Sequence, residues 1–183
     1  INIATLYQLE GNEDKADQIY NDLTKEQKGN PEVLFRRSTL AFKQENFQEG
    51  WRYFENRWKV FPLNKTIWPI QNKTLWKGEK GGRVVLWKEQ GIGDQIILLS
   101  LVPEVQEMCG SVSVYVDPRL HSLCKRTMPE TNFISDEKAL RRENFDYHLS
   151  LGSVPGLIRN DISDFERTVT GYFKADPNRV ELI

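Results

Sequence analysis

The sequence predicts a chain of two parts: helical hairpins at the amino end, followed by an α/β domain with a parallel sheet. Three observations lead to this fold class. Similar residues recur at an offset of 34 in the first 64 residues, apolar periodicity becomes strand-like at Arg83, and a glycine-rich turn follows the first apolar run. The expected boundaries are 1–60 for the hairpins, 61–82 for a linker, 83–176 for the α/β domain and 177–183 for the start of a hinge.

The repeat consists of matched pairs at that constant offset, namely Tyr7 with Ala41, Asn12 with Asn46, Ala16 with Gly50, and Tyr20 with Phe54. The small pair, Ala16 and Gly50, is expected where two helices approach closely, and the aromatic pair packs one turn later on the same face. Each unit is expected to be a helix, a short polar turn and a second helix. Pro31 suits the first turn of a helix.

This period and pattern resemble the tetratricopeptide repeat, whose units recur every 34 residues. The matching positions of the second unit are Leu34, Ser38, Ala41, Phe47, Gly50 and Phe54. The resemblance implies that further repeats precede Ile1, since such hairpins need neighbours to bury their faces. It also implies a protein or peptide partner at the helices. An unrelated αα-hairpin with accidental periodicity is the alternative.

The composition is that of an ordinary globular protein, with 39% hydrophobic and 28% charged residues. The longest apolar run, Ile96–Val102, is too short to cross a bilayer, and no secretory signal is visible, so we expect no membrane span. Residues 31–80 hold ten basic and five acidic side chains. A solvated helix face and an anionic partner both explain this excess, but no motif accompanies it that would indicate nucleic-acid binding.

The chain contains few residues that could bind a metal or take part in redox chemistry. Cys109 and Cys124 are widely spaced, which indicates reduced thiols in a cytoplasmic protein and not a disulfide framework. Only two histidines accompany them, so a zinc site is not expected, and no cofactor is predicted. His148 falls within a predicted strand and is expected to be a core residue. His121 falls on a predicted helix and is expected at the surface.

The linker is rich in proline, glycine and tryptophan. Pro62, Pro69 and the glycines near residue 80 indicate loop structure, and all five tryptophans of the chain lie between residues 51 and 87. An indole on a free linker would leave its large apolar surface exposed to water. We therefore expect the linker to pack across both parts with Trp68 and Trp76 as anchors. Ordinary core filling at the two domain ends and a platform for stacking sugars are the alternatives.

The α/β part alternates strands and helices, which implies a parallel sheet with right-handed crossovers, a Rossmann-like half-domain. The expected strands are 84–87, 111–116, 132–135 and 146–151, and the expected helices are 95–107 and 119–127. Ligands of such sheets bind beyond the carboxyl ends of the strands. The residues at those ends are therefore the candidates for a site.

Asp94 is the main candidate. It follows the turn Gly91-Ile92-Gly93, which is not a dinucleotide fingerprint because Ile96 stands where a third glycine is required. Free nucleotide binding at this turn is also disfavoured, since a carboxylate repels a diphosphate. Asp94 is either a simple N-cap or an ionised general base that points into the crevice, and both roles are compatible.

Four further rim residues accompany Asp94. Glu89 and Gln90 either orient Asp94 and contact acceptor hydroxyls, or make ordinary loop hydrogen bonds. Ser153, after Gly152, either presents its N–H and hydroxyl to a ligand or only forms a turn. The sequence alone does not separate these alternatives.

Four motifs together resemble bacterial tetratricopeptide-repeat proteins that are fused to a glycosyltransferase: Trp87–Asp94, Leu75–Gly78, Leu151–Pro155 and Tyr172–Asp176. The catalytic part of these proteins is similar to the heptosyltransferase-like (family 9) glycosyltransferases of the GT-B fold. The resemblance implies that Asp94 is the base and that this α/β domain holds a glycan or protein acceptor without a metal. The acceptor-binding residues would be Glu89, Gln90, Gly91, Gly93, Gly152 and Ser153.

The resemblance also implies a second α/β domain that binds the nucleotide-sugar. The chain stops at Ile183, and Asp176-Pro177-Asn178 looks like the hinge that leads into that domain. We therefore expect the chain to be the repeat and acceptor-side portion of an inverting glycosyltransferase, inactive by itself. The alternative is a non-catalytic interaction module, in which the hairpins bind a peptide and the α/β part is scaffold.

Overall fold

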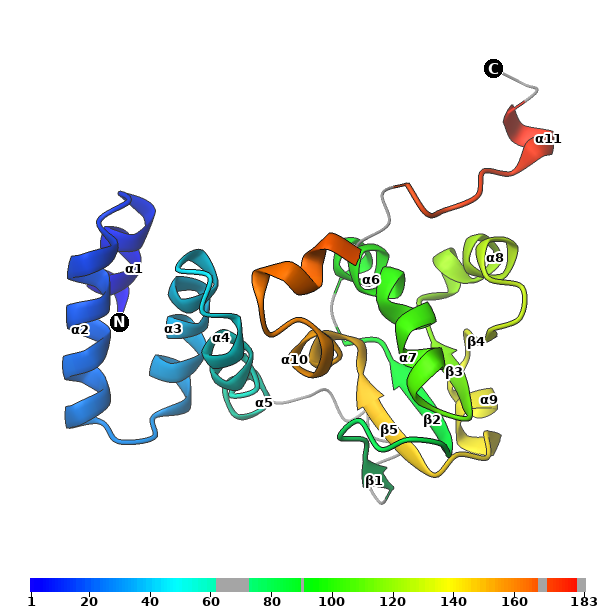
Figure 1. The fold of residues 1–183 in the computed structure, drawn as a ribbon, viewed down its shortest axis with the longest axis horizontal. Coiled ribbons are helices and arrows are strands. Elements are labelled where there is room, and N and C mark those ends of the chain that lie inside the picture. The colour runs from blue at the N-terminus through cyan, green and yellow to red at the C-terminus, as the bar shows by residue number, and fades with distance from the viewer. Residues whose placement is uncertain (62–72, 90, 168–170, 181–183) are drawn as a thin grey trace. The chain divides into compact units, whose positions relative to one another are not determined.

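The computed structural model describes residues 1–61, 73–89, 91–167 and 171–180 (Figure 1). The chain divides into two compact units, one formed by residues 1–64 with 158–166 and the other by 65–157 with 167–183. Half of the expected linker, including Pro62, Trp68 and Pro69, lies outside the described residues, as does Gln90.

The first unit begins with the expected helical hairpins. Asparagine side chains start three of its helices: Asn12, Asn30 and Asn46 each accept a backbone N–H in the first turn of the helix that follows. Pro31 is the first residue of its helix, where its missing N–H has no cost. The helices are α1 (Asn2–Leu9), α2 (Glu13–Glu26), α3 (Pro31–Lys43), α4 (Phe47–Phe54) and α5 (Arg57–Val60).

The small residues of the repeat lie where the sequence predicted close helix contact. Ala16 and Tyr20 are fully buried in the core of the hairpins. A Cβ atom on Gly50 would lie 2.4 Å from the ring of Phe42, so α3 and α4 can approach this closely only because residue 50 is glycine. The expected role of a small residue is confirmed at Gly50, and Ala16 is buried as expected.

The first unit also contains a segment from far along the chain, residues 158–166, which includes most of the turn η4 (Ile162–Arg167). The Trp51 indole Nε1–H donates to the carbonyl of Arg159 at 2.6 Å. The rings of Phe47 and Phe165 pack with their centroids 4.7 Å apart. The sequence analysis placed this segment in the α/β domain, so the compact units differ from the expected boundaries here.

Ion pairs engage half of the ten basic side chains of residues 31–80. Five cations of this stretch each have a carboxylate within 4 Å inside the helical unit. The pairs are Arg36 with Glu32, Arg37 with Asp17, Lys43 with Glu13, Arg52 with Glu49, and Arg57 with Glu55. Three of these carboxylates belong to the same stretch, so only the pairs to Asp17 and Glu13 reduce its basic excess, from five charges to three.

The second unit is built on a parallel sheet of five strands in the order β1-β5-β2-β3-β4 (Figure 1). The four expected strands are present, and β2 lies at the centre, buried except at its first residue. The sequence analysis missed β1, which has only two residues, both exposed. The strands are β1 (Thr74–Leu75), β2 (Arg83–Trp87), β3 (Ser111–Tyr115), β4 (Asn132–Ile134) and β5 (Tyr147–Ser150).

The helix after β2 begins at Ile92, earlier than expected, and is interrupted by a 3₁₀ turn just before Pro103. Proline explains the break, because it lacks an N–H and its ring excludes the carbonyl four residues earlier. The helical elements of this unit are α6 (Ile92–Leu98), η2 (Leu99–Leu101), α7 (Val102–Met108), α8 (Pro118–Thr127), α9 (Glu137–Arg142), η3 (Leu151–Ser153) and α11 (Pro177–Val180), with α10 (Pro155–Ile158) at the unit boundary.

Trp76 and Trp87 fill the core of the α/β unit. Trp76 is 1% exposed and its indole Nε1–H donates to the carbonyl of Glu79 at 3.0 Å. This placement fits the core-filling explanation for Trp76. No helix in the described ranges is both long enough and apolar enough to cross a membrane.

Candidate functional site

The sheet order defines a topological switch point beside the central strand. From β2 the chain proceeds outward to β3 and β4, and then returns to β5 on the other side of β2. The last residues of the two strands at the switch, Trp87 and Ser150, are register partners. Open α/β sheets bind their ligands in the crevice at this point, beyond the carboxyl ends of the strands. The residues after β2 and β5 are therefore the candidate site.

A hydrogen-bonded cluster links these two strand ends. The Ser150 hydroxyl donates to Glu89 Oε1 at 2.6 Å, and the hydroxyls of Ser150 and Ser153 lie 3.0 Å apart. Ser150 is 1% exposed and Ser153 is 9% exposed. Two of the expected acceptor-binding residues, Glu89 and Ser153, are thus brought together by Ser150, which the sequence analysis did not single out. Its position at the end of the strand, two residues before Gly152, was the available signal.

The same contacts bear on the alternatives for Ser153 and Gly152. Gly152 is buried in η3, and the Ser153 hydroxyl faces Ser150 in the interior. This favours the turn-forming role for the pair. Glu89 is half-buried and combines a loop hydrogen bond with a position at the rim of the sheet.

Asp94 is exposed and lies in the first turn of α6, directly after the central strand. The N-cap of this helix is Gly91, and no side chain of the described residues caps it. The N-cap explanation for Asp94 is therefore wrong, because the helix starts earlier than the sequence suggested. Negative charge in a first helical turn still interacts favourably with the helix dipole.

The two glycines of the turn leave open surface beside this carboxylate. Gly91 has a φ of −60°, and Gly93 is not among the residues with positive φ, so neither backbone conformation demands glycine. A Cβ on Gly91 would lie 3.5 Å from Asp94 Oδ2, and one on Gly93 would meet no atom of the described chain within 4 Å. Packing among the described residues thus does not explain these glycines.

Gln95, next to Asp94, points the other way and is 2% exposed. Its Oε1 accepts the backbone N–H of Asp117 at 2.9 Å, and its Nε2 lies 3.5 Å from the carbonyl of Gly91. The sequence analysis missed this residue. A polar side chain at the head of an apolar run was the only signal.

Two other carboxylates of the rim, Asp117 and Asp136, serve as helix caps. Asp117 caps α8 and accepts two hydrogen bonds from the Arg119 guanidinium, which lower the pKa of this carboxyl to about 2. Asp136 caps α9 through the N–H of Ala139 at 2.8 Å. Both groups are occupied in folding roles and Glu89 accepts the Ser150 hydroxyl, so among the described acids named here Asp94 is the exposed one without such a role.

The two histidines have structural partners. His148 is 5% exposed and its Nδ1 accepts the Trp87 indole N–H at 3.2 Å, so the expected core position is confirmed, and burial lowers its pKa. His121 is half-buried with Nε2 3.0 Å from the carbonyl of Phe133. The expectation of a plain surface residue is wrong for His121, because α8 turns this side chain toward β4.

The Tyr172–Asp176 motif packs against two helices of the same unit. The Tyr172 hydroxyl donates to the carbonyl of Ile96 in α6, and burial raises the pKa of this tyrosine. Arg126 of α8 donates to the carbonyl of Lys174 at 2.9 Å. The motif therefore supports the helix that carries Asp94.

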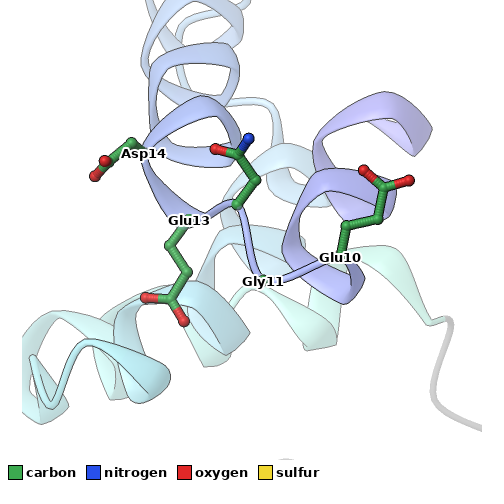
Figure 2. A pocket seen from close by; sticks show the side chains of 5 residues that line it. Glu10, Gly11, Glu13 and Asp14 are labelled. Atoms are coloured by element: carbon green, nitrogen blue, oxygen red, sulfur yellow. The ribbon is translucent and has the colours of Figure 1, made fainter.

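The helical unit has an open hollow of about 480 Å³ at the turn between α1 and α2 (Figure 2). Its lining includes Glu10, Glu13 and Asp14, whose carboxylates point in different directions in Figure 2. Among the described residues, no group of three or more histidine, cysteine, aspartate or glutamate side chains is arranged to hold a metal ion. The hollow is the surface of a helix turn and offers no converging ligands.

Comparisons with known proteins give one distant likeness. No protein-family model matches the chain, and no solved structure matches it. Protein FlbA of Caulobacter vibrioides (strain ATCC 19089 / CIP 103742 / CB 15) is 26% identical over 174 residues, which cover 83% of this chain and 29% of FlbA. The chain thus spans less than a third of that relative's length.

Proposed function

We propose that this chain is the repeat and acceptor-side portion of a cytoplasmic, inverting, metal-independent glycosyltransferase of the GT-B type, with Asp94 as general base. The observation that carries the proposal is the exposed Asp94 carboxylate in the first turn after the central strand, beside the switch point of the sheet. The open surface over Gly91 and Gly93 supports it, since an acceptor can approach the carboxylate there.

In this reaction Asp94 takes the proton of an acceptor hydroxyl, in a glycan or a protein side chain. The acceptor oxygen attacks the anomeric carbon of the donor sugar from the face opposite the leaving group. The bond from that carbon to the nucleoside diphosphate breaks, and the diphosphate leaves with the electron pair. Because such a displacement needs both substrates held in line, the donor site is assigned to a part of the protein outside this chain.

The helical unit would recruit the acceptor or another protein in the manner of tetratricopeptide repeats. The same unit supports the second candidate, a non-catalytic interaction module. Three exposed apolar side chains recur every three residues along α1, namely Ile3, Leu6 and Leu9. Such a row on one helix face is typical of a surface that contacts another polypeptide.

An Asp94→Asn substitution in the full-length protein tests the first candidate. We expect sugar transfer to fall by about 10²–10⁴-fold, the usual contribution of a general base. Transfer is measured as incorporation of label from radiolabelled UDP-, GDP- and ADP-hexoses into an extract of cells that lack the gene. The matched control is Glu107→Gln, an acid-to-amide change at an exposed position at the opposite edge of the sheet. Unchanged transfer in Asp94→Asn would reject the assignment of Asp94 as general base. The non-catalytic interaction module would then be the remaining candidate.

A further inference from the structure

We propose that Gln95 is a positioning residue for the proposed base, because it fixes the glycine turn and the first turn of α6 against the loop after β3. The proposal rests on the proposed function, since it concerns how Asp94 is held. Gln95 itself is buried and touches no reacting atom.

The neighbouring side chains of Asp94 and Gln95 have different roles at this turn. Asp94 and Gln95 are consecutive in α6, yet Asp94 is exposed whereas Gln95 is 2% exposed. Successive residues of a helix point about 100° apart, so an anchored side chain at 95 sets the direction of its neighbour. Fixing Gln95 therefore fixes where the Asp94 carboxylate points.

The Gln95 amide connects two loops at the carboxyl edge of the sheet. Its Oε1 accepts the Asp117 N–H at 2.9 Å, at the point where the chain leaves β3. On the other side, its Nε2 lies 3.5 Å from the Gly91 carbonyl, which also accepts the Gln95 backbone N–H at 3.1 Å in the helical pattern that any residue at this position keeps. One residue thus joins the start of the glycine turn to the neighbouring loop.

An amide suits this place because it must accept on one side and donate on the other. A carboxylate can accept from Asp117 but would face the Gly91 carbonyl with a second acceptor. An apolar side chain fills the space but leaves the Asp117 N–H without this partner, and the side chain of Asp117 is already occupied as the cap of α8.

The test replaces Gln95 by leucine in the full-length protein, with Gln106→Leu as the matched control. Gln106 lies in the same helical stretch, is half-buried, and donates one hydrogen bond to Thr131 at 3.0 Å, away from the rim. We expect Gln95→Leu to lower kcat by about 100-fold, the effect of misplacing a catalytic group by an ångström, with KM little changed. Gln106→Leu is expected to keep the wild-type kcat.

A second readout does not depend on transfer. Amide hydrogen exchange at Asp117 is expected to rise about tenfold in Gln95→Leu, as for the loss of one hydrogen bond, and to stay unchanged in Gln106→Leu. If Gln95→Leu does not fold, Gln95→Met takes its place. It keeps the length of the side chain and lacks the acceptor for Asp117, so its kcat is expected to fall as far as for the leucine change.

The outcomes separate the two proposals. An inactive Asp94→Asn together with a fully active Gln95→Leu overturns the inference and leaves the base in place. An active Asp94→Asn overturns both. A loss of kcat in Gln106→Leu equal to that in Gln95→Leu also overturns the inference, since the effect would then follow from general loosening of the helix. If Gln95→Leu speeds amide exchange at Asp117 but leaves kcat unchanged, the Gln95–Asp117 hydrogen bond is structural and does not position Asp94. That result also rejects the inference.

Discussion

Gly50 is the residue at which the contact between two helices is decided. A Cβ there would lie 2.4 Å from two ring atoms of Phe42, closer than any side-chain carbon can come. Gly50→Ala is therefore expected to lower the free energy of unfolding of the helical unit by about 1–3 kcal/mol, the usual cost of overpacking. The measurement is urea unfolding followed by circular dichroism.

The matched control for this substitution is Gly93→Ala. A Cβ on Gly93 meets no atom of the described residues within 4 Å, and alanine favours helix over glycine by up to about 1 kcal/mol. Stability should be unchanged or slightly higher, whereas transfer should fall if an acceptor lies against this turn. An equal effect of both substitutions on stability would contradict the packing argument at Gly50.

The sequence predicted the roles of some single residues and not of others. Gly50 was predictable because the repeat offset pairs it with Ala16, another small residue. Ser150 and Gln95 were not, because their roles depend on partners that lie far along the chain, Glu89 and Asp117 respectively. Pairings across a sheet edge leave no periodic signal in a single sequence.

At the scale of elements, the segment 158–166 completes the helical unit by packing on α4. Trp51 reaches it through a 2.6 Å hydrogen bond to the Arg159 carbonyl, and its ring also stacks on Phe42 at 4.3 Å. The last turn of the hairpins is therefore covered by a part of the chain that follows the sheet. A domain boundary drawn from the amino-terminal repeat alone omits this segment.

Trp51→Phe tests this contact, since it keeps an aromatic ring and removes the indole N–H. We expect faster amide exchange within 158–166 and a loss of about 1 kcal/mol in the stability of the helical unit, typical of one hydrogen bond. Trp58→Phe is the matched control, because the Trp58 indole donates within its own turn to Glu55 at 3.0 Å. Equal exchange in 158–166 for both variants would refute the anchoring role of Trp51.

The start of α6 shows why boundaries of elements are hard to predict. Asp94 matches the residue types favoured at N-caps, yet the helix begins at Ile92 with Gly91 as its N-cap. Cap preferences among glycine and aspartate differ by only a few tenths of a kcal/mol, so tertiary packing chooses the first residue. That choice moves Asp94 from a capping position to an exposed one.

At the scale of the whole molecule, the chain passes from the helical unit to the α/β unit and back before it ends in the α/β unit. Each unit is therefore discontinuous in sequence. The amino end of the central strand is held to the loop before β5 by Arg83, whose guanidinium makes two hydrogen bonds to the Asp146 carboxylate. This pair joins segments that are far apart along the chain.

Acid should lower the stability of the α/β unit, because it protonates the Asp146 carboxylate that pairs with Arg83. The Arg83 hydrogen bonds lower the pKa of Asp146 from 3.8 to about 2. A carboxyl whose pKa is lower in the folded state stabilises the fold when ionised, so its contribution is complete above about pH 4 and is lost as the pH falls toward about 2. Urea midpoints measured across this range should fall, and should fall less in Asp146→Asn. Asp117, with its pKa also near 2, adds to the same dependence.

Glu107→Gln is the control for the acid series, because it removes a carboxylate outside this pair. It should keep the wild-type dependence on pH. Identical slopes for Asp146→Asn and the wild-type protein would show that the pair contributes nothing measurable, as happens for some exposed ion pairs.

The sequence by itself determined the local features of this protein: hairpins from a 34-residue offset, four strands from their apolar runs, and a carboxylate after the glycine turn. These features depend on residues close together in the chain, where helix and strand periodicity act. Only the tertiary structure decided that β5 returns beside β2, that Ser150 and Gln95 support the rim, and that residues 158–166 complete the hairpins. Those outcomes depend on burial and on hydrogen bonds between distant segments, which form only when the chain packs as a whole.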